Sequence, residues 1–93
     1  MINMKQIAEL VVEFVGTFVL VSVILRTRTN DAPFKVAVVL AACLIAFSPY
    51  GPTHLNPALS MATMLKEQTE PLKIMAMVAS QVAGAAVASQ LAK

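Results

Sequence analysis

The sequence has little charge, one cysteine, one histidine and no tryptophan. Only 13% of its 93 residues are charged and 58% are hydrophobic, whereas about a quarter of an ordinary globular domain is charged. A lone cysteine excludes an intrachain disulfide, and with a single histidine it leaves no ligand set for a metal. The net charge of +2 comes without a basic patch, so we expect no nucleic-acid partner. We also find no catalytic constellation and no cofactor motif, and predict that the protein is not an enzyme.

The charges that are present are grouped, and the groups separate long uncharged stretches. These stretches cover residues 14–25, 36–65 and 74–92. The mean hydropathy is +0.76, and a bilayer core takes about 20 apolar residues per helix. Glu9 and Glu13 interrupt the first apolar stretch, which argues against a cleaved signal peptide. The pattern predicts a multi-pass integral membrane protein of unknown membrane, a single domain over residues 1–93 with three transmembrane helices at about 7–25, 34–47 and 72–91.

The stretch 48–65, between the second and third predicted helices, fits neither a water-exposed loop nor a spanning helix. It carries no charge, yet three prolines and a glycine interrupt its first half. A re-entrant segment remains, which membranes tolerate where protein or a water-filled cavity satisfies its backbone. Asn56 followed by Pro57 is typical of a helix N-cap and first helical position. The sequence therefore predicts an extended loop that enters the membrane and returns as a half-helix.

The last predicted helix carries small residues at every fourth position. Ala76, Ser80, Gly84 and Ala88 form a stripe of the small-xxx-small type, which lets two helix backbones approach closely. We expect this stripe to be a helix-packing face.

Three motifs together resemble the aquaporin, or major intrinsic protein, family. Residues 51–60 read GPTHLNPALS and resemble the family's signature loop, SG-A-H-x-N-P-A-V-T. Residues 13–17 read EFVGT and resemble the first-helix EFxGT, and residues 81–86 read QVAGAA and resemble the third-helix AQxxGA. The resemblance spans nearly the whole chain but corresponds to only the first half of a family member, which is built from two inverted halves. It implies an all-α membrane fold with three transmembrane helices and one re-entrant NPA half-helix.

The resemblance also implies roles for individual residues. Asn56, at the NPA segment with Pro57 and Ala58, would donate amide hydrogen bonds to a passing solute, and the positive end of the half-helix would repel cations. Backbone carbonyls of Thr53, His54 and their neighbour Pro52 would line the pore as acceptors. Two polar side chains would be structural rather than pore-lining: Glu13, holding the signature loop by its backbone N–H groups, and Gln81.

The selectivity filter is where this sequence departs from the family. The arginine that follows NPA in the family's second half is Leu59 here, and the aromatic filter position falls on Val36. A symmetric pair of chains would build its constriction from Val36, Thr53 and Leu59, each twice. This predicts a filter that is wider and more apolar than a water-only one.

These observations predict a passive channel for water or small neutral solutes such as glycerol. Because one copy cannot enclose a pore, we expect two half-length chains to associate with inverted topology in the bilayer, within a larger homo-oligomer such as a tetramer of dimers. Two alternatives stay open. One is an accessory half-subunit that needs a different partner chain, and the other is a holin-like small membrane protein that acts through assembly alone.

Overall fold

The computed structural model describes residues 3–27, 32–50 and 54–93. Within these ranges the chain is all helical and contains no strand, as the sequence predicts. The elements in chain order are α1 (Met4–Arg26), α2 (Ala32–Phe47), the short 3₁₀ helix η1 (Ser48–Tyr50), α3 (Pro57–Lys66) and α4 (Pro71–Leu91).

The helix ends follow local capping signals. α1 begins three residues earlier than predicted because Asn3 and Gln6 form a capping box, in which each side chain accepts a 2.9 Å hydrogen bond from the other's backbone N–H. α4 begins with Pro71 in its first turn, where a missing N–H costs nothing. At its other end, the Arg26 guanidinium donates a 3.2 Å hydrogen bond to the carbonyl of Leu91, one of the carbonyls that the helix leaves unpaired.

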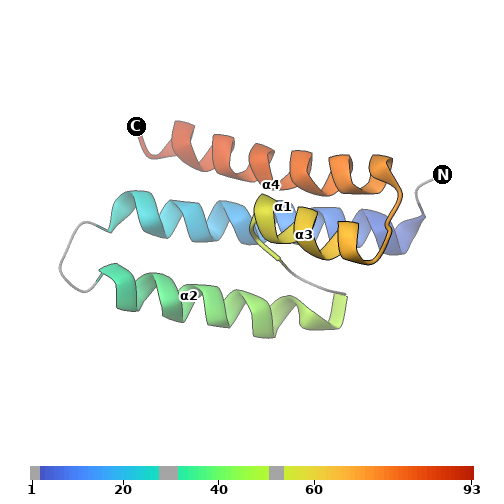
Figure 1. Ribbon diagram of the computed structural model, residues 1–93. Helices are drawn as coiled ribbons and strands as arrows, with labels where there is room; N and C mark the ends of the chain where they lie inside the picture. The colour runs from blue at the N-terminus through green and yellow to red at the C-terminus, as the bar shows by residue number, and fades with distance from the viewer. Residues whose placement is uncertain (1–2, 28–31, 51–53) are drawn as a thin grey trace.

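α1 is the central helix of the molecule (Figure 1). α4 runs parallel to it on one side, α2 returns antiparallel on the other, and α3 packs against α4. The N- and C-termini lie at opposite ends of the long axis, and the molecule measures 43 × 24 × 22 Å. α2 therefore contacts α1 and η1 but leaves much of its surface uncovered.

The stripe of small residues forms the contact between α4 and α1. Gly84 faces the backbone of α1 so closely that a Cβ at this position would collide with the carbonyl oxygen of Phe14. The Ser80 hydroxyl donates to the carbonyl of Leu10, and Ala88 is fully buried. Small side chains thus bring the two backbones together, which is the packing expected from the sequence.

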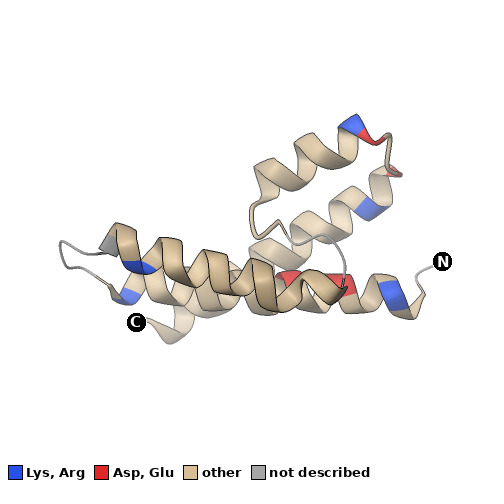
Figure 2. Cartoon of the chain, turned by 90° about the horizontal axis from the view of Figure 1, so that it is seen from below, with Lys and Arg blue, Asp and Glu red and all other residues tan. Residues whose placement is uncertain are grey.

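Two helices, α1 and α4, are long and apolar enough to cross a membrane. The third predicted crossing is shorter, because α2 has only 16 residues. Many large apolar side chains are exposed on the helix surfaces, among them Phe34, Ile45, Leu72 and Met75. In Figure 2 the basic residues gather toward the two ends of the helices, and the middle is uncharged except for an acidic part of α1.

Candidate functional site

The candidate site is built where the chain enters α3. Leu55 adopts a left-handed conformation, with φ of 57°, which is uncommon for a residue with a side chain. Two contacts hold it there: its N–H is hydrogen-bonded, and its buried side chain packs over Gly16, where a Cβ would lie 2.5 Å from Leu55 Cδ2. The glycine in α1 therefore makes room for the turn that starts α3.

The carboxylate of Glu13 holds this turn in place. One of its oxygens, Oε2, accepts the N–H of His54 at 2.8 Å, and the other, Oε1, accepts the N–H of Leu55 at 2.8 Å. Oε1 also accepts a 2.8 Å hydrogen bond from the side-chain nitrogen of Gln81 on α4. Glu13 is fully buried, so a buried carboxylate receives three hydrogen bonds, as a buried charge requires.

Gln81 extends this network to α3 and to the histidine. Its Nε2 donates a second hydrogen bond, of 2.7 Å, to the hydroxyl of Ser60, which lies 2.7 Å from His54 Nδ1. A hydroxyl can accept two hydrogen bonds and donate one, so Ser60 can accept from Gln81 and hydrogen-bond to the imidazole at the same time. Glu13, Gln81, Ser60 and His54 together connect α1, α4 and α3.

The same network leaves one buried acceptor without a partner. Gln81 uses both of its amide hydrogens, and its Oε1 has no hydrogen-bond partner among the described residues. The hydroxyl of Thr17, one turn beyond Glu13 on α1, is also buried and has no hydrogen-bond partner in the part of the chain that the structure describes. The orientation of the glutamine is thus fixed by the two acceptors to which its amide nitrogen donates, and its side-chain carbonyl remains without a hydrogen bond, which is unfavourable for a buried acceptor.

Asn56 is the N-cap of α3 and is exposed. Its Oδ1 accepts the N–H groups of Ala58 at 2.8 Å and Leu59 at 3.3 Å. These two bonds fix which way the amide is turned. Its Nδ2 makes no hydrogen bond within the part of the chain that the structure describes, so two N–H donors are presented at the positive end of α3.

The other predicted site residues that the structure describes lie in the first turn of α3 and on α2. Pro57, Ala58 and Leu59 form the first turn of α3 and are exposed, Leu59 at 50%. Val36 is half-buried on α2. Thr53 and Pro52 lie outside the described residues, so the predicted filter and carbonyl ladder stay predictions.

Ser60 is the site residue that the sequence analysis missed. It is fully buried and joins Gln81 to His54. The spacing gives a signal that would have found it, since Ser60 follows Asn56 by one helical turn and is one of two hydroxyl residues, with Thr63, in the mainly apolar half-helix.

The chain was compared with models of protein families, with curated proteins and with solved structures, and none of them matches it.

Proposed function

We propose that the protein is a passive membrane channel for water or small neutral solutes, formed by two inverted copies of the chain. The observation that carries the proposal is the amide of Asn56. Its oxygen accepts two backbone N–H groups in the first turn of α3. The amide therefore cannot flip, and its two N–H donors face outward. A solute oxygen can accept hydrogen bonds from these donors, whereas a cation is repelled by the positive end of the helix.

The network behind Asn56 supports the same function. A channel needs its donors at a fixed position, and the loop before Asn56 is hydrogen-bonded to Glu13 at two successive backbone N–H groups. Irregular backbone and a buried carboxylate inside a membrane both call for internal partners. Glu13 and the loop satisfy each other, which fits a segment that enters the membrane without crossing it.

The third crossing can be completed by η1. α2 with its 16 residues spans about 24 Å, and the three residues of η1 add about 6 Å. The combined length of about 30 Å matches the hydrocarbon core of a bilayer. The proposal therefore treats α1, α2 with η1, and α4 as three crossings and α3 as the re-entrant half-helix.

A second copy accounts for the surfaces that one copy leaves open. α2 packs on α1 and η1 alone, and the first turn of α3 is exposed around Asn56. A second copy related by a two-fold axis in the membrane plane would cover α2 and the first turn of α3 with its own α2 and α3. The basic residues permit this, because the sequence segments that flank the predicted crossings on the two sides of the membrane carry nearly equal numbers: three on one side (Lys5, Lys66 and Lys73) and four on the other (Arg26, Arg28, Lys35 and Lys93). So small a difference gives little preference for either orientation.

The test is osmotic shrinkage of liposomes that contain this protein alone, under gradients of sucrose and of glycerol. Asn56→Ala removes the donors together with the cap of α3, and should lower solute flux. Asn56→Asp keeps a capping oxygen but replaces the donors by an anion, so it should let cations leak. Asn3→Ala is the matched control, because it removes the asparagine cap of α1 by the same change and should leave flux unaltered.

The result also separates the alternatives. Unchanged flux in both Asn56 variants would refute the channel and favour a protein that acts through assembly alone. Absence of flux from the pure protein, together with copurification of another chain, would favour an accessory half-subunit.

A further inference from the structure

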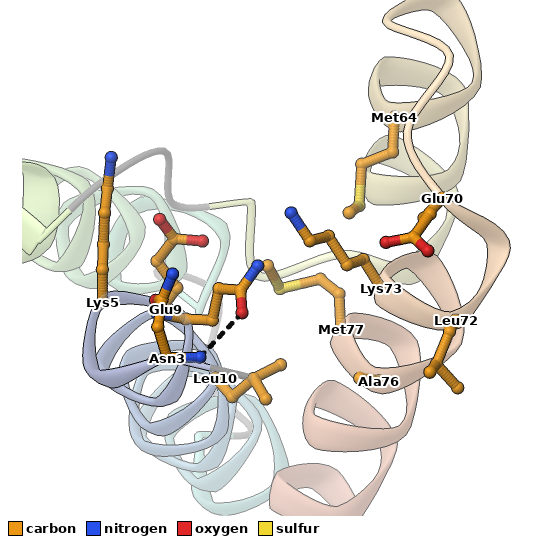
Figure 3. Close-up of a pocket in the computed structure, with 11 residues that line it drawn as sticks. Asn3, Lys5, Glu9, Leu10, Met64, Glu70, Leu72, Lys73, Ala76 and Met77 are labelled. Atoms are coloured by element: carbon orange, nitrogen blue, oxygen red, sulfur yellow. Dashed lines mark hydrogen bonds between the residues drawn. The ribbon is translucent and has the colours of Figure 1, made fainter. Parts of the chain in front are cut away.

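A pocket of about 380 Å³ opens at the end of the molecule that carries the N-terminus. It lies between the first turns of α1, the last part of α3 and the first turns of α4 (Figure 3). Its lining contains two kinds of side chain, apolar ones such as Leu10 and Met77 and charged ones. The charged residues are Lys5, Glu9, Glu70 and Lys73. The pocket thus combines an apolar wall with two cations and two carboxylates.

These four charges are not paired with one another. None of them forms an ion pair within the described residues, and in the view of Figure 3 the ammonium of Lys73 lies between the carboxylates of Glu9 and Glu70. Lys5, Glu70 and Lys73 are exposed and Glu9 is half-buried. A net charge of zero, spread over separate positive and negative groups, is complementary to a ligand that is itself a zwitterion.

The position of the pocket points to the source of such a ligand. It lies at the ends of α1 and α4, the two helices long and apolar enough to cross a membrane. In the membrane-embedded state that the proposed function assumes, this is the level of the phospholipid headgroups. A lipid there would place its phosphate near the lysines, its ammonium near the glutamates and its glycerol and upper acyl chains against Leu10 and Met77.

We propose that the pocket binds the headgroup of phosphatidylethanolamine. Its primary ammonium donates hydrogen bonds to carboxylates, and its phosphate accepts them from lysine. A choline headgroup cannot donate in this way and is typically held by aromatic faces, whereas no aromatic side chain of the described residues lines the pocket. An anionic headgroup such as that of phosphatidylglycerol would meet two carboxylates with no ammonium to offer them.

The test is native mass spectrometry of the purified protein in detergent, with phosphatidylethanolamine, phosphatidylcholine and phosphatidylglycerol of identical acyl chains supplied in equal amounts. Phosphatidylethanolamine should be retained preferentially. Lys73→Gln and Glu70→Gln should each lower its retention about two- to fivefold, the range that exposed ion pairs give, and Lys73→Arg should preserve it. Lys66→Gln and Glu67→Gln are matched controls, since they make the same charge changes close by, at the end of α3 and directly after it, but do not line the pocket.

Several outcomes would overturn the assignment. Equal retention of the three lipids would exclude recognition of the headgroup, and equal loss in the Lys66 and Glu67 controls would reduce the effect to net charge. Free phosphoethanolamine that binds as tightly as the lipid would exclude the lipid as the source. If Lys73→Gln does not fold, Lys5→Gln makes the same test from α1.

The lipid site and the channel can fail separately. Asn56→Ala should lower flux and keep the lipid preference, whereas Lys73→Gln should weaken the preference. A protein that retains phosphatidylethanolamine but conducts nothing would refute the channel alone, and one that conducts without any preference among lipids would refute the lipid site alone.

Discussion

Replacement of Glu13 by glutamine or by leucine should distinguish two roles for its carboxylate: holding the site together through hydrogen bonds, or only lying near the membrane surface. In the structure the carboxylate receives three hydrogen bonds of 2.8 Å, from His54, Leu55 and Gln81. Glu13→Gln keeps an oxygen for the two donors at Oε1, and turns an amide nitrogen toward the third. Glu13→Leu leaves all three donors without a partner.

The magnitudes follow from the cost of a buried donor that loses its partner, about 1–3 kcal/mol each. The glutamine variant should lose about 1–3 kcal/mol of stability through one donor, and the leucine variant about 3–9 kcal/mol through three. Denaturant unfolding in detergent micelles measures the difference. The same pair of changes at Glu9 is the control, because this residue lies one turn earlier on α1 and its side chain makes no hydrogen bond within the described chain. Equal stability of the two Glu13 variants would refute the role given to this residue.

Three further predictions test other parts of the structure. Thr17→Val should leave stability unchanged or raise it by about 1 kcal/mol, because the hydroxyl is buried without a partner among the described residues. A clear loss of stability in thermal unfolding would show that the hydroxyl is hydrogen-bonded. Gly84→Ala should destabilise the protein by about 1–3 kcal/mol in the same assay, because the added methyl pushes α4 away from α1, and tolerance of the change would contradict the close contact. Cysteines placed at Thr27 and Thr69 in a cysteine-free background should each be labelled from both sides of the native membrane; labelling of each from one side only would exclude the inverted pair.

The sequence predicts the helices well wherever a local signal marks their ends. The Asn56–Pro57 pair identified the start of α3, and the small stripe identified the face of α4 that packs on α1. α1 begins earlier than the apolar periodicity predicts, because the Asn3–Gln6 capping box extends it by a turn of polar residues. The helix predicted at 34–47 ends where expected and begins two residues earlier, but with 16 residues it is shorter than the two helices that are long enough to cross a membrane.

The candidate site was predictable only in part, because its contacts are long-range. The bond between Glu13 and the signature loop was expected from the family resemblance, and the structure places these groups 2.8 Å apart. The link through Ser60 was not expected, since it depends on how α3 is rotated against α4. Periodicity indicates which face of a helix is apolar, but not which neighbour a single hydroxyl meets on that face.

Glu13 is synthesised long before the groups that hold it. Leu55 follows it by 42 residues and Gln81 by 68. At about 5–20 residues per second, the ribosome reaches Gln81 about 3–14 s after Glu13. In the membrane-embedded state that the proposed function assumes, α1 spends this interval with an unsatisfied carboxylate, and an acidic side chain near the middle of a lone helix costs on the order of 3 kcal/mol. In that state α1 is a marginal span during translation, and it becomes stable in the membrane only when α4 has been made and supplies Gln81.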